Sequence, residues 1–205
     1  MKKIVAFVFV FSLLFSLFAV DNAQNYDTIS LYLHSTVMVD AITTSFNSKE
    51  ESNRANREGV ALKVGVDAFK NEDLGAKFGA TADICVDYPF RSKESSAITL
   101  GKLPYLALSG GILFRSRPWD YIDISLSVKG VVSTYDYKAI SLGVSVEPSC
   151  DVYFDDYFYL KVSMSYGSDI LKFPFNDEYF LIRNNLPSRF SFGVGCGYAF
   201  GGYSK

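Results

Sequence analysis

The residue types that usually carry catalysis are sparse in this chain. His34 is the only histidine, and the residues around it carry no signature of a nucleophile or a metal site. We interpret His34 as a hydrogen-bonded side chain that shares the polar face of a strand with Thr36. Asp155 and Asp156 are adjacent, which is typical of a solvated turn. The sequence therefore predicts no enzyme, no cofactor and no metal site.

The cysteines and a short glycine series are better explained by their small size than by chemistry. The three cysteines show neither CxxC nor metal-ligand spacing, and an odd number cannot pair completely within one chain; they are Cys85, Cys150 and Cys196. We expect small buried or lipid-facing thiols and keep a disulfide as the alternative. The glycines alternate on one strand face, so they are no phosphate-binding loop; they are Gly193, Gly195 and Gly197.

Charged residues recur on the polar faces of the strands that the sequence predicts, and both signs are represented. The set is Lys63, Asp67, Lys77, Asp83, Asp123, Lys129, Glu147, Asp151, Lys161 and Arg189. Unpaired charges in a narrow interior are costly, whereas opposite charges on neighbouring strands neutralise one another. We predict a lumenal network of ion pairs and not a wide pore. The alternative is an exterior of solvated charges.

These residues must be positioned by strands, because apolar and polar residues alternate with period two along most of the chain. The alternation restarts after each cluster of turn residues and predicts strands over residues 28–37, 59–71, 75–87, 100–114, 121–134, 139–154, 157–167 and 189–200. After residue 20, no uninterrupted apolar run is long enough for a helical span. We expect an all-β fold, an eight-stranded antiparallel up-and-down transmembrane barrel.

The connections are predicted to alternate between short turns and long loops, as in outer-membrane barrels. Residues 71–74, 115–120 and 155–156 are short, 40–58, 88–99 and 168–188 are long, and 135–138 breaks the alternation. Residues 43–57 are polar and mixed in charge, which favours a mobile solvated loop. Residues 170–182 are rich in Phe, Tyr, Leu and Ile. They form either a cap on the rim or an interaction surface, with Phe173, Phe175, Tyr179 and Phe180 as the candidate residues.

Alternation alone does not say which way the apolar face points, because soluble lipocalin-like barrels also alternate. The polar face is rich in Ser, Gly and Thr, which suits a narrow lumen better than a solvated surface. Aromatic residues gather near both predicted rims, as in membrane-interface girdles. One group is Trp119, Tyr121, Tyr153, Phe154, Tyr157, Phe158, Tyr198 and Phe200; the other is Tyr88, Phe90, Tyr105, Tyr135, Tyr137 and Tyr166. We therefore expect the apolar face to meet lipid.

The first residues resemble an export signal. Lys2 and Lys3 precede an apolar run that ends near residue 20, and Ala23 suits cleavage. We expect residues 1–23 to be a cleaved signal peptide, with a membrane-anchoring helix as the alternative, and residues 24–205 to form one barrel domain. The net charge of −2 suggests no nucleic-acid partner.

The segment F192-G-V-G-C-G-Y-A-F200 resembles the C-terminal assembly signal of bacterial outer-membrane barrels, with Gly195, Tyr198 and Phe200 at its defining places. The chain as a whole resembles the small barrels of the OmpA/OmpX and OmpW-like class. That resemblance implies the bacterial outer membrane, its lipid and its assembly machinery as partners. We expect a structural or adhesin-like surface-interaction role, in which the extracellular loops meet a protein or a small apolar ligand. The alternatives are a narrow conduit for small hydrophobic solutes and a soluble lipocalin-like binder.

Overall fold

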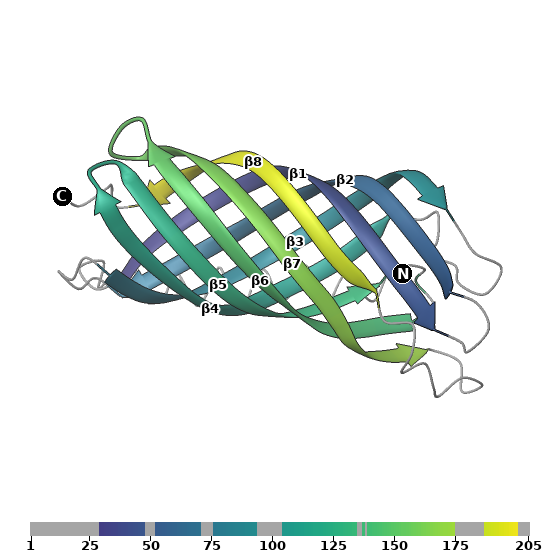
Figure 1. The fold of residues 1–205 in the computed structure, drawn as a ribbon. Coiled ribbons are helices and arrows are strands. Elements are labelled where there is room, and N and C mark those ends of the chain that lie inside the picture. The colour runs from purple at the N-terminus through teal and green to yellow at the C-terminus, as the bar shows by residue number, and fades with distance from the viewer. Residues whose placement is uncertain are drawn as a thin grey trace.

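The computed structural model describes residues 29–47, 52–70, 76–93, 104–134, 137, 139–174 and 187–200. They form the strands β1 (Ile29–Asn47), β2 (Ser52–Lys70), β3 (Ala76–Lys93), β4 (Tyr105–Trp119), β5 (Ile122–Thr134), β6 (Ala139–Tyr153), β7 (Phe158–Pro174) and β8 (Ser188–Phe200). Each strand pairs antiparallel with the next, and β8 pairs with β1 to close a barrel (Figure 1). The eight-stranded prediction is confirmed. The expected signal peptide and Phe175, Tyr179 and Phe180 lie outside the described residues.

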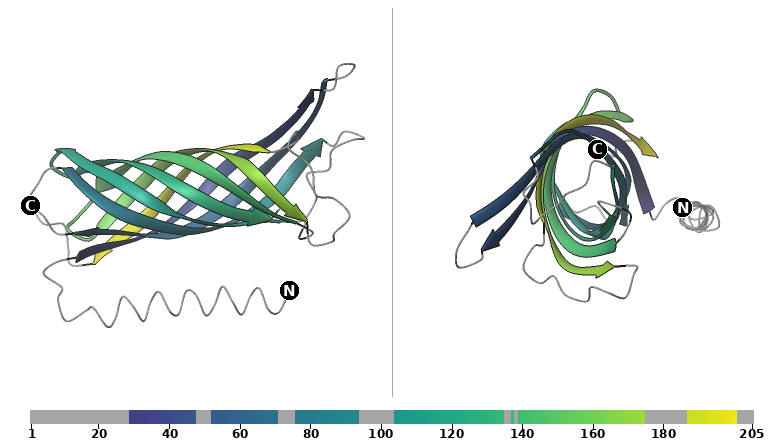
Figure 2. Two further views of the ribbon diagram at one scale, coloured as in Figure 1. Left: turned by 90° about the horizontal axis from the view of Figure 1, so that it is seen from below. Right: turned by 90° about the vertical axis from the view of Figure 1, so that its right-hand side faces the viewer.

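The register fixes how far the strands tilt. Paired residues can be followed around the barrel from Tyr32 on β1, through each strand in turn, to Arg189 on β8. Arg189 pairs with Ile42 on β1, which lies ten residues beyond the starting point (42 − 32). A stagger of that size across eight strands corresponds to a tilt of roughly 40°. Such a barrel is just wide enough to be filled by side chains. The right-hand view of Figure 2 shows the closed ring of strands nearly end-on.

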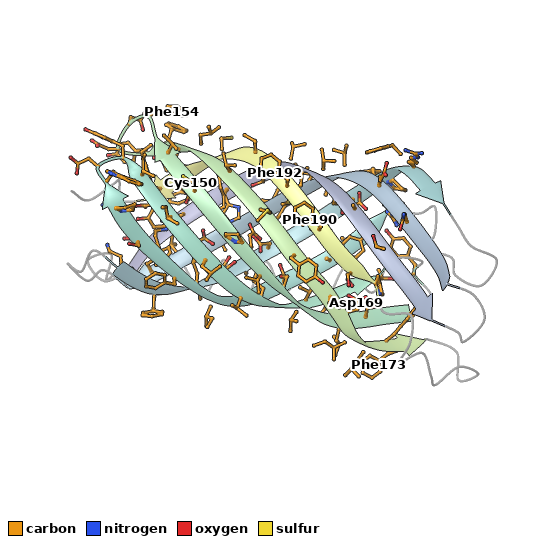
Figure 3. All side chains as sticks on the ribbon, in the orientation of Figure 1. Cys150, Phe154, Asp169, Phe173, Phe190 and Phe192 are labelled. Carbon is orange, nitrogen blue, oxygen red and sulfur yellow. The ribbon has the colours of Figure 1, made fainter. Side chains whose placement is uncertain are left out.

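The two faces of the wall are inverted relative to a soluble barrel. On β1, Val37 and Val39 are 56% and 60% exposed, while Met38 between them and Asp40 beyond them are buried. The same contrast recurs on every strand, so apolar side chains project outward around the barrel (Figure 3). The alternation in the sequence thus follows from a wall with a polar inside and an apolar outside.

The strands at one rim are longer than the sequence predicts. We call this rim, where β1, β3, β5 and β7 end, the loop end, and the opposite rim the turn end. Residues 43–57 are not a long loop: β1 continues to Asn47 and β2 begins at Ser52. Beyond Thr43, β1 has lost its β8 partner and pairs with β2 alone, and the hairpin projects from the barrel in Figure 2. Backbone pairing between two strands needs no apolar side chains, which is why composition was a poor guide here.

A second correction concerns the short connection expected at residues 115–120, because residues 115–119 are strand. β4 runs to Trp119, and the turn is confined to Asp120 and Tyr121, the latter with a φ of 71°. Pro118 falls within a register shift between Ser116 and Trp119, the kind of position at which a sheet tolerates a residue without an N–H. Arg115 is consequently a lumenal strand residue.

β3 and β7 likewise extend beyond residues 87 and 167, to Lys93 and Pro174. The short connections at 135–138 and around 155–156 agree with the sequence. None of the described residues forms a helix long and apolar enough to cross a membrane.

Candidate functional site

The barrel interior is divided into three layers, and the middle layer is a network of buried charges. Glu147 accepts hydrogen bonds from Lys63 and from Lys129, the latter at 2.8 Å. Lys129 also donates to Asp83 at 2.6 Å. His34 Nε2 lies 3.7 Å from Asp83 and 3.5 Å from Asp67, and thereby bridges the two carboxylates. Lys63, Glu147, Lys129 and Asp83 thus form a chain in which positive and negative groups alternate.

Arg115 is the centre of the same network towards the turn end. Its guanidinium nitrogens lie 3.4 Å from Asp67, 3.3 Å from Asp151 and 3.7 Å from Asp123. Lys161 reinforces the cluster at 3.4 Å from Asp151. Arginine suits this position because its planar group offers five donors, which a lysine does not.

The layer at the turn end is aromatic. Arg115 lies over the rings of Tyr32 and Phe69, 4.2 Å and 4.3 Å from their centroids, an arrangement that favours a cation. The buried cluster beneath comprises Tyr32, Phe69, Leu113, Tyr153, Tyr159 and Ala199. Gly197 leaves room for it, because a side chain at that position would overlap the Tyr159 ring. The rings close the lumen at this end.

At the loop end, two further ion pairs accompany a small apolar cluster. Arg189 Nε lies 2.7 Å from Asp40, and Arg57 lies 3.0 Å from Asp87. Arg189 also donates to the Cys85 thiol at 3.2 Å and lies over the Tyr105 ring. Met38, Ile42, Ala61 and Ala107 pack with Cys85 and Tyr105.

The structure brings most of the predicted lumenal charges together. Lys63, Asp67, Asp83, Lys129, Glu147, Asp151 and Lys161 form the middle layer with Asp123, while Arg189 belongs to the loop-end layer. Lys77 is different: it stands opposite Arg115 in the β3–β4 register and makes no ion pair with another described residue.

The sequence reasoning missed Arg115, Arg117, Arg57, Asp40 and Asp87. All but Arg117 are buried inside the barrel, and Arg117 donates to Asp123 at 2.9 Å. Arg57 and Arg115 lie at even spacing from Lys63 and Leu113 on their own strands. Extending the alternation past the expected turns would therefore have identified both.

The expected aromatic girdles also need correction at two positions. Tyr105 and Tyr153 are buried in the lumen, at 2% and 4% exposure, because each lies an even number of residues from lumenal neighbours. Most of the other described rings face outward, and a ladder at the turn end joins Tyr157, Phe158, Tyr198 and Phe200, with centroids 5.0–5.8 Å apart.

Outside the spanning strands, the turn between β6 and β7 holds one well-defined carboxylate. Asp155 accepts hydrogen bonds from the backbone N–H groups of Phe158 and Tyr157 at 2.6 Å and 2.7 Å. These two bonds, that of Phe158 first, lower the pKa of Asp155. In the described part of the chain, His, Cys, Asp and Glu nowhere form a group that could hold a metal ion, and the three cysteines are free thiols.

The decisive observation is that a charged interior lies inside an apolar exterior. A continuous apolar outer surface of this extent is unfavourable in contact with water and favourable in contact with lipid. This is the fold of an outer-membrane β-barrel. The lipocalin-like arrangement, with its apolar face inward, does not apply.

No family model matches the sequence, and no curated protein matches it either. Among solved structures, the barrel is similar to Neisserial surface protein A, at 12% identity and a TM-score of 0.48, covering 81% of this chain and 97% of that one. It is also similar to Ail, the attachment invasion locus protein of Yersinia pestis, at 14% identity and a TM-score of 0.40, covering 82% and 98%. The outer membrane protease OmpT from Escherichia coli follows at 8% identity and a TM-score of 0.40, covering 86% and 98%. The likeness concerns the barrel architecture and carries no function with it.

Proposed function

We propose that this chain is a surface-interaction protein of the bacterial outer membrane, and that its loop end binds an extracellular protein. Residues 1–23 would direct export and be removed, and residues 24–205 would insert with the loop end outside. Gly195, Tyr198 and Phe200 would then serve the assembly machinery. The charged lumen supports this role over a conduit for hydrophobic solutes, because a charged interior does not favour an apolar solute.

The observation that carries the proposal is the loop-end segment of β7. A register shift at Leu142/Gly143 in β6 accompanies the departure of β7 from the alternating pattern. Beyond it, Ile170 and Leu171 are exposed on successive positions, at 53% and 52%, and Phe173 follows at 41%. Both faces of the strand are thus accessible, and Figure 3 shows Phe173 at the outer rim.

This segment offers what a protein partner recognises. Apolar side chains supply the contact area. No described residue of β8 pairs with β7 beyond Ser168, and a strand edge of this kind can accept a strand from a partner. Lys172 adds a positive charge between Leu171 and Phe173. An adhesin-like contact with a folded protein therefore fits better than capture of a free small molecule.

The proposal is tested by expressing the chain in a non-adherent bacterium and measuring attachment to cultured epithelial cells. We expect attachment to rise with expression and to be lost in Ile170→Ser/Phe173→Ser. Phe154→Ser at the turn end is the matched control, because Phe154 is 71% exposed on the opposite rim; it should attach like the unmodified chain. Equal attachment with and without the barrel, or no effect of the double substitution, would contradict the proposal.

A further inference from the structure

The hydrogen-bond ladder between β6 and β7 is interrupted in the middle of the wall. β6 pairs with β7 up to Val146 and again from Ser149, in an unchanged register. Glu147 and Pro148 between them form no pair with β7, although both pair with β5 on their other side. Pro148 has no N–H to donate to β7. The ladder therefore lacks a hydrogen bond at this point.

Pro148 differs in this respect from two other prolines of the wall. Pro118 lies within the register shift between β4 and β5, and Pro89 pairs with Gly59 next to the register shift between β2 and β3. Such irregularities accommodate a residue without an N–H. At Pro148 the flanking pairs keep one register, so no bulge compensates for the missing bond.

A second irregularity in the same seam is the register shift at Leu142/Gly143, on the loop-end side of Pro148. Between the two irregularities, β6 and β7 are joined by four residue pairs only. We call residues 143–146 of β6, with their partners 166–169 of β7, the isolated stretch; Asp169, at its loop-end limit, is labelled in Figure 3. Local opening starts where few interactions must be broken, and the isolated stretch offers such a place.

The side chains of the isolated stretch add little to its stability. Ser145 stands opposite Gly167, so two small residues meet there. Glu147, the neighbouring charged residue on β6, forms its ion pairs with Lys63 on β2 and Lys129 on β5. These pairs hold β6 to the middle layer of the lumen and do not connect it to β7.

A lumenal cavity of about 50 Å³ lies directly behind the isolated stretch. Its lining includes Ser145 and Glu147 of β6 and Gly167 of β7. Val144 also lines the cavity, although it is 47% exposed on the outer face of the barrel. The cavity therefore reaches the wall at this seam, and the strands are backed there by the cavity instead of by packed side chains.

We propose that β6 and β7 part along the isolated stretch and at Pro148, and that this opening connects the lumenal cavity with the bilayer. On the outer face, Val146, Met164 and Tyr166 are 41%, 43% and 58% exposed, so the opening faces hydrocarbon. Charged molecules are largely excluded from hydrocarbon, and only small uncharged molecules would reach the cavity by this route. The opening is a property of the wall and does not depend on the attachment role.

Cys85 reports on the opening, because it lines the cavity. The test uses the full chain folded in lipid vesicles, with Cys150→Ser and Cys196→Ser to remove the other free thiols. Methyl methanethiosulfonate, a small uncharged reagent, is added, and mass spectrometry follows the modification of Cys85. Pro148→Val supplies the missing N–H. We expect it to slow the modification about threefold or more, the effect of one ladder hydrogen bond on a local opening.

Pro118→Val is the matched control, because Pro118 is also an exposed proline of the wall but lies within a register shift. This variant should react as fast as the chain with both prolines, and gel mobility before heating verifies that each variant is folded. An unchanged rate in Pro148→Val, which entry from the loop end would give, would overturn the proposal. Equal slowing by both substitutions, or no reaction of Cys85 at all, would do the same.

Amide hydrogen exchange of the unmodified barrel gives a second readout that needs no substitution. Tyr166 lies in the isolated stretch, and Val162 lies in the same seam on the other side of Pro148. Val128 on β5 pairs with Val146 and lies at the same level of the wall. We expect the amide of Tyr166 to exchange at least about tenfold faster than those of Val162 and Val128. Similar or slower exchange at Tyr166 would contradict a local opening of this seam.

Discussion

Replacing Glu147 by glutamine tests the central claim about the lumen most directly. Lys129 keeps Asp83 as a partner at 2.6 Å in Glu147→Gln, but Lys63 loses its only ion-pair partner among the described residues. Lys63 is 5% exposed, so the substitution leaves a buried ammonium without a counter-charge. Breaking a buried pair in this way costs about 3–5 kcal/mol. We expect the free energy of unfolding to fall by that amount.

The assay is urea unfolding of the barrel in lipid vesicles, followed by the fluorescence of Trp119, the single tryptophan, and by gel mobility. Glu58→Gln is the matched control: its pair with Arg91 spans 3.7 Å between side chains that are 44% and 76% exposed. Exposed pairs contribute about 0–1 kcal/mol, so this variant should unfold almost like the unmodified protein.

A second substitution separates loss of the pair from loss of packing. Lys63→Met added to Glu147→Gln removes the orphaned charge, and neutral replacement of a buried pair is often tolerated. The double variant should therefore be more stable than Glu147→Gln alone. A cost below about 1 kcal/mol for Glu147→Gln, or additive losses in the double variant, would refute the assignment of a desolvated lumenal network.

Further outcomes follow from other parts of the barrel. Arg115→Lys should lower the free energy of unfolding by about 2–3 kcal/mol, because lysine cannot reach three carboxylates and lie over two rings at once; urea unfolding measures it. Gly197→Ala should destabilise the barrel by about 1–3 kcal/mol through overlap with Tyr159, and Tyr159→Leu should restore part of the loss; no rescue would locate the strain elsewhere. Because the pKa of Asp155 is lowered, its carboxylate stabilises the turn at pH values above the ordinary carboxyl pKa, and this stabilisation is lost as the pH falls through the lowered pKa. The difference in free energy of unfolding between the unmodified protein and Asp155→Asn should therefore shrink on acidification. A difference that stays constant with pH would contradict this prediction. Planar-bilayer recording should show no steady conductance through the native lumen, whereas stable open channels would contradict the closed interior.

The sequence predicted the architecture because the wall has two chemically distinct faces. Alternation located the core of every strand, and the serine- and glycine-rich polar face indicated the correct orientation. It did not locate the strand ends, since Arg57 and Arg115 stand where turn-like or wholly polar composition hides the period. Tyr105 and Tyr153 were assigned to the rims by proximity to turns, although their position in the alternation places them inside.

The sequence could not predict which lumenal charges pair with each other, for a different reason. Lys63 and Glu147 are 84 residues apart, and Arg115 and Asp67 are 48 apart. Which charges meet depends on the stagger of the whole barrel, and on shifts such as that at Ser116/Trp119, which no local pattern specifies.

The long sequence separation within the network bears on how the barrel can be made. β2 reaches its counter-charge only when β6 is in place, and Arg189 on β8 meets Asp40 on β1 only at the final seam. An incomplete sheet therefore faces lipid with uncompensated charges on one side, which penalises its release into the bilayer. A seam that slipped by two residues would also separate these partners. The lumenal ion pairs are therefore all formed only in the complete barrel with its native register. Incomplete or slipped forms are less stable in the membrane, so the network favours correct assembly.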